Sequence, residues 1–412
     1  MSDQQPQGGG APRFDRADEE ALVALVERFA KEEIAPFVTA WDAAGEFPRP
    51  LYQRASELGL LGLGYPQEFG GTPATHRMKS LVSQTFARVT GSGGVHASLY
   101  SHSIGLPPIL KHGSQELKLE IVPPVLRGEK ISALGITEPG GGSDVAAIKT
   151  TAVHAAAGQG DDYLINGEKT FITSGVRCDF LTAAVRTGDA GSKGASYEAA
   201  RGAAGISLIV IPMHLPGVSR TRLDKMGWHA SDTAHIRFDN VRVPARLLVG
   251  QEGAGFKMIM GNFNGERLGM SVLALGFAQA CFEEALDWAR QRKTFGQVLI
   301  ESQVIRHKLV DMQMRIASTQ AWCDALTARA DAGEETASKE VAARWVAEVC
   351  MLKNHATQTM QFCADQAVQI LGGMGFMRGT KSERIYREVK VMMIGGGAEE
   401  IMKELASRQL GL

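Results

Sequence analysis

The hydrophobic periodicity of this chain changes twice along its length, and this restricts the fold more than any other feature. Apolar residues at helical spacing, such as Leu22, Val26 and Phe29, continue with Gly and Pro breaks to about residue 128. From 131 to 243 the chain is instead rich in glycine and β-branched residues in short runs. After Gly255 it is helical again almost to the C-terminus. The order of helices, strands and helices predicts an α+β protein built in three parts.

The three parts have predicted boundaries and predicted strands. We expect a disordered tail at 1–13, an N-terminal α-helical domain at 14–130, a central β-domain at 131–247 and a C-terminal α-helical domain at 248–412. A loop at 188–205, rich in Gly, Ala and Ser, is expected to be mobile. Asn166-Gly167 lies between two strand-like runs and predicts a two-residue hairpin. The predicted strands are 150–154, 162–165, 170–173, 180–185, 206–211 and 235–238.

Charge and composition exclude several classes of protein. The chain has 412 residues, with 44 Lys and Arg against 45 Asp and Glu, so its net charge of −1 gives no positive field to bind nucleic acid or an anionic membrane. The N-terminus has neither the basic nor the apolar region of a secretory signal, and no run of 18 apolar residues predicts a membrane span. The five cysteines form no CxxC pair, so we expect no zinc site and no disulfide framework. These features predict a cytoplasmic protein.

Familiar cofactor and catalytic motifs are absent from the sequence. No GxGxxG follows a strand, and there is no GxxxxGK[ST], HExxH or GxSxG. Nicotinamide binding at a Rossmann site, phosphoryl transfer at a P-loop and serine hydrolysis are therefore not supported.

Two segments of the β-region carry residues suited to a flat heterocycle. In 133–144 a strand end leads into a glycine-rich turn, where backbone N–H groups and the hydroxyls of Thr137 and Ser143 can receive polar ring edges or phosphate oxygens. The alternative is a capped turn with no ligand. In 163–175, Phe171 and Thr173 are two apart on one expected strand face and can pack on and hydrogen-bond such a ring. The alternative is a buried aromatic on a sandwich face.

Together with two later segments, these residues resemble the acyl-CoA dehydrogenase family of flavoproteins from about residue 17 to the C-terminus. Four motifs in order carry the resemblance: Thr137-Glu138-Pro139 with Gly142-Ser143-Asp144; Phe171-Ile172-Thr173; Arg292-Lys293-Thr294-Phe295-Gly296 followed by Gln303; and Gln369-Ile370-Leu371-Gly372-Gly373-Met374-Gly375-Phe376. Phe171 stands where the family usually carries Trp, so the ring is kept but the indole N–H is lost. Several motifs in order are far more specific than any one of them.

The resemblance implies a fold, a cofactor and partners. It implies an N-terminal helical domain, a central β-domain and a C-terminal helical bundle, assembled as a homotetramer that is a dimer of dimers. FAD would lie between the β-domain and the C-terminal helices, the substrate would be an acyl-CoA and the electron acceptor would be electron-transfer flavoprotein. The FAD contacts implied within one subunit are Leu134, Ile136, Thr137, Gly142, Ser143, Phe171, Thr173 and Glu400. Those implied for the FAD of a neighbouring subunit are Arg292, Thr294, Phe295, Gln303, Gln369, Leu371, Gly372 and Gly373.

The catalytic base is not at the position most common in the family. Many members carry it near the C-terminus, where this chain has Gly396, which cannot accept a proton. Glu266 is the candidate instead, because Ile259, Phe263, Glu266, Met270, Leu273 and Phe277 form one face of a helix on which only Glu266 is polar. Burial would raise its pKa towards neutrality, as a general base requires. A salt bridge with Arg267 is the alternative, although adjacent helical residues point about 100° apart.

The surrounding residues complete this prediction. The Asn264-Gly265-Glu266-Arg267-Leu268 segment resembles isovaleryl-CoA and long-chain acyl-CoA dehydrogenases, which place their base there. The rival carboxylates, Glu399 and Glu400, follow three glycines at an expected helix start, which lowers their pKa.

The resemblance implies a mechanism for these residues. The thioester carbonyl would be polarised by a flavin ribityl hydroxyl and the Gly396 N–H, Glu266 would remove the α-proton, and the β-carbon would give a hydride to FAD N5. Asn264 and Arg267 would meet the pantetheine of CoA, and Ser143 would contact the substrate. Glycines at 395–397 would leave room for a medium-to-long or branched acyl chain. A flavin oxidase or monooxygenase on the same scaffold and a catalytically silent CoA-binding protein are the alternatives.

Overall fold

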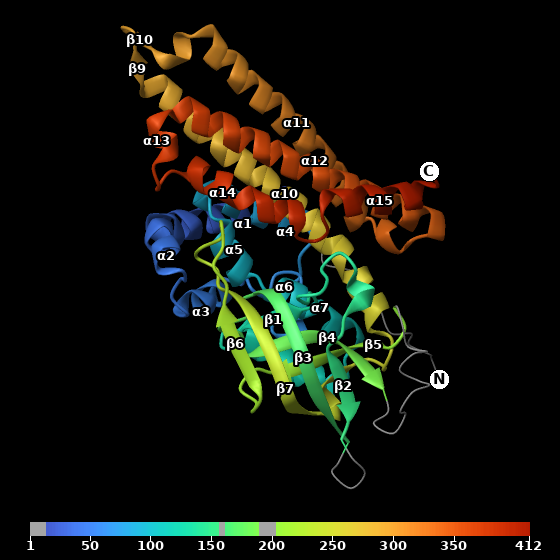
Figure 1. Ribbon diagram of the computed structural model, residues 1–412. Coiled ribbons are helices and arrows are strands. Elements are labelled where there is room, and N and C mark those ends of the chain that lie inside the picture. Colours follow the sequence, from blue (N-terminus) through green and yellow to red (C-terminus); the bar gives the residue numbers. More distant parts are fainter. Residues whose placement is uncertain (1–13, 156–160, 189–202) are drawn as a thin grey trace, which may run out of the picture.

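The computed structural model describes residues 14–155, 161–188 and 203–412 (Figure 1). The predicted tail at 1–13 and most of the predicted loop at 188–205 lie outside these residues. The first described segment forms helices whose ends follow local sequence signals. The Asp15 side chain forms a capping box with Asp18 at the start of the first helix, and Gly91 ends the fourth in a left-handed conformation. These helices are α1 Arg16–Phe29, α2 Val38–Ala44, α3 Pro50–Glu57, α4 His76–Thr90, α5 Gly93–Leu99, α6 His102–Gly105, α7 Pro107–His112 and α8 Gln115–Leu126.

A mostly antiparallel sheet follows the helices. Its strand order is β6-β7-β3-β2-β4-β5-β8, and β1 pairs in parallel with β4. The core strand β5 is buried along its whole length, which fits its continuous apolar run. The strands are β1 Ser132–Gly135, β2 Thr151–His154, β3 Asp162–Thr173, β4 Phe180–Gly188, β5 Ile206–Pro212, β6 Val218–Arg222, β7 Thr233–Pro244 and β8 Leu248–Val249.

The predicted hairpin at Asn166-Gly167 is wrong. The two runs expected on either side of it form the single strand β3, and a register shift against β7 lies between Ile165 and Gly167. Gly167 has a φ of 140°, and a Cβ there would lie 2.6 Å from the Cα of Thr150. Gly167 therefore lies in a β-bulge, where its backbone closely approaches Thr150, and not in a turn.

The C-terminal part is a bundle of long helices. Helix α10 packs along α12 and also contacts α4 of the N-terminal part (Figure 1). The elements are α10 Gly255–Gln291, β9 Lys293–Thr294, β10 Gln297–Val298, α11 Gln303–Asp331, α12 Lys339–Leu371, α13 Gly373–Phe376, α14 Lys381–Ile394 and α15 Glu399–Leu410. The predicted order of helices, strands and helices is thus confirmed.

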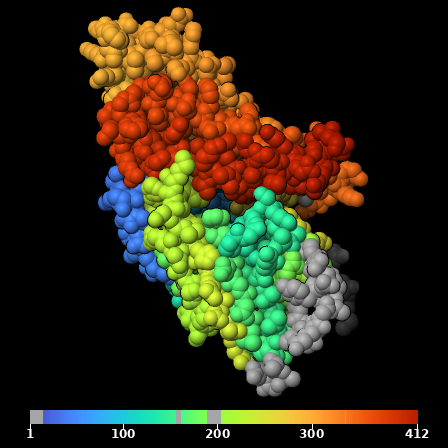
Figure 2. Space-filling view, viewed as in Figure 1, coloured from blue at the N-terminus to red at the C-terminus, as the bar shows by residue number. Residues whose placement is uncertain are grey.

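Two large hydrophobic cores hold these parts together. One runs without a break through the N-terminal helices and the sheet, and the other fills the C-terminal bundle and includes Ala87 of α4. Figure 2 shows that the surface is hollowed where the red C-terminal helices meet the green and yellow β-strands. In the described part of the chain, no helix combines the length and apolarity needed to cross a membrane. The boundaries at 130/131 and 247/248 stay predictions.

Candidate active site

Glu266 lies on α10, in the helix that the sequence predicted. Ile259, Leu273 and Phe277 of the same line are buried, as expected for a face that packs against the protein. The Glu266 side chain keeps partial exposure, but its Oε2 is buried and accepts no hydrogen bond from any described residue. Burial raises the pKa of Glu266 from 4.5 to about 7, against the opposing effect of the positive charges of Arg267 and Lys353.

A glycine turn joins α14 to α15 beside this helix. Gly396 and Gly397 have φ values of 66° and 113°, which L side chains rarely adopt. A Cβ on Gly396 would lie 2.8 Å from the Met270 Sδ, and Met270 is one helical turn beyond Glu266. The Met270 thioether thus lies against Gly396, and the room that the glycines were expected to leave for an acyl chain stays a prediction.

The carbonyl groups of the turn are bound by side chains of α10 and α12. Arg267 is buried and donates from Nε to the Gly396 carbonyl at 3.0 Å and from Nη1 to the Asn264 Oδ1 at 3.1 Å. Lys353 donates to the Gly397 carbonyl at 2.7 Å. The structure thus pairs Asn264 and Arg267 with each other and ties Arg267 to the turn. Their predicted contact with pantetheine stays a prediction.

Glu399 and Glu400 occupy the first turn of α15, as predicted. Glu399 accepts a hydrogen bond from the Gln358 Nε2 at 2.8 Å, while Glu400 is exposed. Acidic residues in the first turn of a helix interact favourably with its dipole, which gives both glutamates a structural role at the start of α15.

Phe171 occupies a strained and exposed position on β3. It has a φ of 60°, lies in the register shift between Lys169 and Ile172, and is 70% exposed. The sequence predicted regular alternation of side chains along this strand, which would place Phe171 and Thr173 on one face. The bulge interrupts that alternation between Lys169 and Ile172. A large aromatic ring held outwards by backbone strain provides an apolar surface for a flat ring and fits the FAD that the resemblance implies.

The glycine-rich turn after β1 is anchored to β3 next to Phe171. Thr137 and Thr170 exchange two hydrogen bonds, from the Thr170 N–H at 2.9 Å and from the Thr137 hydroxyl at 2.5 Å. Thr137 and Leu134 are partly exposed and Ile136 is buried, whereas Gly142 and Ser143 are exposed. The predicted contacts of the first motif and of Phe171 and Thr173 therefore come together at one edge of the sheet.

A buried ion pair supports this edge. The Lys169 Nζ lies 2.7 Å from the Glu138 Oε1 and donates to the Ile136 carbonyl at 3.1 Å. Glu138 also accepts the N–H groups of Lys149 and Thr150. The ammonium and these hydrogen bonds lower the pKa of Glu138, although its burial acts in the opposite direction. Charge-assisted bonds to Glu138 thus fix the turn.

The remaining predicted cofactor residues lie far from this edge. Helix α10 continues from Glu266 to Gln291, so Arg292 is about 40 Å farther along the helix axis. Figure 1 shows β9, β10 and α13 at the same distant end of the bundle. Phe295 is fully exposed there, with a φ of 52°. The residues of this group are Arg292, Thr294, Phe295, Gln303, Gln369, Leu371, Gly372 and Gly373, of which Leu371 is buried. Arg292 and its neighbours thus lie at the far end of the bundle from Glu266, and their contacts with FAD stay predictions.

Sequence reasoning missed two buried lysines near the site. Lys353 follows Val349 and Cys350 on an apolar face of α12, which is the signal that singled out Glu266. Lys169 has no such signal, because its partner Glu138 lies 31 residues away and is brought near only by the pairing of the sheet with the turn.

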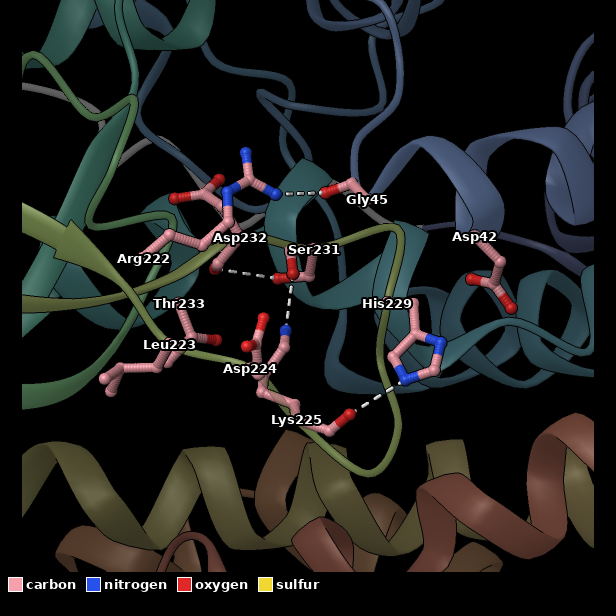
Figure 3. Close-up of a pocket in the computed structure, with 10 residues that line it drawn as sticks. All are labelled: Asp42, Gly45, Arg222, Leu223, Asp224, Lys225, His229, Ser231, Asp232 and Thr233. Atoms are coloured by element: carbon pink, nitrogen blue, oxygen red, sulfur yellow. Dashed lines mark hydrogen bonds between the residues drawn. The ribbon is translucent and has the colours of Figure 1, made fainter.

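A polar cavity of about 190 Å³ lies where α2 meets the segment between β6 and β7 (Figure 3). Arg222 donates to the Gly45 carbonyl, Lys225 to the Ser231 carbonyl, and the His229 ring bonds the Lys225 carbonyl. None of the predicted catalytic or binding residues lines this cavity. Arg222, Lys225 and His229 bond the protein itself, so the candidate active site remains at Glu266 and the glycine turn.

Comparison with known proteins shows matches along nearly the whole chain. Residues 16–129, 133–241 and 253–411 match the N-terminal, middle and C-terminal domains of acyl-CoA dehydrogenase, respectively. A probable acyl-CoA dehydrogenase of Bacillus subtilis is 33% identical, covering 96% of this chain and 99% of its own length. The mitochondrial long-chain specific acyl-CoA dehydrogenase of Rattus norvegicus is also 33% identical, covering 97% and 88%.

Solved structures agree with these matches. The crystal structure of a probable acyl-CoA dehydrogenase from Mycobacterium abscessus has a TM-score of 0.88 and 44% sequence identity, and covers 96% of this chain and 99% of its own. The domain matches and the relatives each extend over nearly the whole sequence. The chain therefore belongs to the acyl-CoA dehydrogenase family, and it is a FAD-dependent oxidoreductase that acts on CH–CH groups.

Proposed function

We propose that this protein introduces an α,β double bond into a medium-to-long or branched acyl-CoA, with Glu266 as the base. The observation that carries the proposal is the Glu266 carboxylate, which has a buried and unpaired Oε2 beside the glycine turn. Burying an unpaired carboxylate costs several kcal/mol, roughly, so its retention favours a catalytic use. With its pKa near 7, Glu266 can accept a proton at neutral pH.

The other residues of the chain orient the substrate. The Gly396 N–H donates to the thioester carbonyl, which acidifies the α-carbon, and Glu266 removes the α-proton. Bound FAD supplies the acceptor for the hydride that leaves the β-carbon. Phe171, Thr137 and Thr173 hold the flavin ring edge, and Ser143 contacts the substrate.

The partners are part of the same proposal. Electron-transfer flavoprotein takes the electrons, and the protein is a homotetramer built as a dimer of dimers. The distance between the two groups of cofactor residues supports a second subunit, because Arg292 and the α12–α13 turn contact FAD only if it belongs to a neighbour. The cytoplasmic location expected from the sequence stays a prediction.

An anaerobic titration tests the proposal. The purified FAD-loaded protein is mixed with a panel of straight and branched acyl-CoAs while the absorption of the oxidised flavin is followed. We expect bleaching in the wild type and a fall of roughly 100-fold or more in the reduction rate for Glu266→Gln, the size of a general-base contribution. Glu404→Gln is the matched control, because Glu404 is an exposed partner of Arg408 on α15. Glu399→Gln and Glu400→Gln test the rival carboxylates.

Each alternative predicts a different result. A protein that no acyl-CoA reduces, although it keeps its FAD, is a silent CoA-binding protein and contradicts the proposal. Rapid reoxidation of the substrate-reduced flavin by oxygen identifies an oxidase or monooxygenase. Full bleaching of Glu266→Gln at the wild-type rate places the base elsewhere.

A further inference from the structure

Lys353 is a fully buried lysine that the proposed reaction does not use. Its side chain is 0% exposed, and its Nζ donates to the Met393 carbonyl at 3.0 Å and to the Gly397 carbonyl at 2.7 Å. These carbonyls belong to the last turn of α14 and to the glycine turn that follows it. A buried ammonium must replace its lost hydration with hydrogen bonds inside the protein. The two bonds from Lys353 therefore hold the backbone at Met393 and Gly397 in place.

The glycine turn has one occupied side and one open side. Its carbonyl side is bound by Lys353 at Gly397, by Arg267 at Gly396 and by the Asn354 Nδ2 at Glu399. On the amide side, the N–H groups of Gly396 and Gly397 donate no hydrogen bond to any residue that the structure describes. Left-handed glycines with free successive N–H groups form a concave donor site for a negatively charged oxygen.

We propose that Lys353 is a positioning residue of the reaction, holding the glycine turn so that its free N–H groups face the thioester carbonyl next to Glu266. This inference rests on the proposed function, because it concerns the same carbonyl and the same base. Lys353 touches neither substrate nor cofactor. It acts through the backbone of Met393 and Gly397.

The charge of Lys353 acts on Glu266 as well. The charged and titratable groups that interact with this pair are Arg267 on α10, Cys350 on α12 and Glu399 on α15. Burial lowers the pKa of Lys353 to about 8, so the ammonium is charged at neutral pH. Its positive charge lowers the pKa of Glu266 and keeps that carboxyl able to lose its proton near pH 7. Removing the charge therefore raises the pKa of Glu266.

Two substitutions separate the hydrogen bonds from the charge. Lys353→Met removes both, whereas Lys353→Gln removes the charge and keeps a donor. Thr359→Val is the matched control on the same helix, because Thr359 is buried and bonds Thr319 away from the turn. All variants are purified with FAD, and their folding is checked by thermal unfolding.

The first measurement is the binding of acetoacetyl-CoA by calorimetry, which does not depend on turnover. Its acidic α-carbon lets the enolate oxygen occupy the position of the polarised carbonyl. For Lys353→Met we expect a Kd raised roughly ten- to a hundredfold, the value of a hydrogen bond to a charged group. Lys353→Gln should lose less affinity, and Thr359→Val should bind as the wild type does.

The second measurement is the pH dependence of flavin reduction by an acyl-CoA. The reduction rate should rise with pH as Glu266 loses its proton. The midpoint of this rise, here called the Glu266 limb, should move to higher pH in Lys353→Met and Lys353→Gln alike, and not in Thr359→Val. A purely structural lysine would change the rate without moving this limb. Wild-type affinity together with a wild-type pH profile in Lys353→Met overturns the proposal. If that variant does not fold, the same result in Lys353→Gln overturns it.

The result for the wild type keeps the two proposals apart. A wild type that no acyl-CoA reduces contradicts the proposed function. A wild type that is reduced, with lysine variants that behave identically to it, contradicts only the role of Lys353.

Discussion

Replacing Glu266 with glutamine should remove activity and at the same time make the protein more stable at alkaline pH. The pKa of Glu266 is about 7 in the folded protein against an ordinary value of 4.5. The folded state therefore binds this proton more tightly than the unfolded state does, and stability falls as the pH rises from 4.5 to 7. Above pH 7 the loss is complete, and 2.5 pKa units correspond to about 3 kcal/mol.

The difference between wild type and variant isolates this group. At pH 5.5 the wild type has lost only about 1 kcal/mol, and at pH 8 it has lost about 3 kcal/mol. The advantage of Glu266→Gln should thus grow by about 2 kcal/mol between the two pH values. Any pH-independent effect of the glutamine side chain on stability is the same at the two pH values. The titration of the other groups is common to wild type and variant, so it cancels from their difference.

Urea-induced unfolding at pH 5.5 and pH 8 measures this difference. Wild type and variant are compared at equal protein and FAD concentrations, because ligand binding and assembly also shift apparent stability. Glu404→Gln serves again as the control, because the Glu404 carboxylate is exposed and pairs with Arg408 on α15. A stability difference between wild type and Glu266→Gln that does not change with pH would refute the raised pKa, and with it the argument that burial prepares this carboxyl as a base.

Three further substitutions test other parts of the site. Gly396→Ala forces a side chain into a left-handed conformation and against Met270, so thermal unfolding should show a loss of about 1–2 kcal/mol and flavin reduction should slow; unchanged values would contradict the tight turn. Lys169→Met leaves Glu138 buried without its cation, so we expect about 3 kcal/mol less stability and a lower ratio of FAD to protein, and normal FAD content would count against this anchor. Phe171→Ala should leave the apoprotein as stable as the wild type but weaken FAD binding about three- to tenfold in a titration, and equal affinity would rule out ring packing there.

Periodicity predicted the elements that depend on local pattern. Helix α10 and its line from Ile259 to Phe277 follow from a 3.6-residue repeat, and the start of α15 follows from glycines before Glu399 and Glu400. The hairpin prediction failed because Asn-Gly suits both a turn and a bulge. Only the contact between Gly167 and Thr150 decides between them, and that contact depends on the pairing of β2 with β3.

The hydrogen-bond partners of polar side chains could not be predicted either. The contact of Arg267 with pantetheine stays a prediction, and the structure adds a bond from its Nε to the carbonyl of Gly396, which lies 129 residues away in sequence. Nothing local to α10 indicates that partner. Lys353 carried a readable signal, a cation on an apolar helical face, but its meaning depends on where α14 ends. Sequence pattern thus identifies unusual residues more readily than their partners.

The proposed base on α10 and the glycine at 396 depend on each other. The Gly396 φ of 66° would cost a glutamate roughly 1–2 kcal/mol, and its Cβ would meet the Met270 Sδ at 2.8 Å. Met270 stands on the same helical face as Glu266, one turn farther on, so the helix that supplies the carboxylate also fills the space at the turn. The conformation that opens the Gly396 and Gly397 N–H groups is available to glycine at little cost. A carboxylate at 396 would therefore have to displace the end of the Met270 side chain and strain the backbone of the proposed donors, whereas Glu266 on α10 leaves both undisturbed.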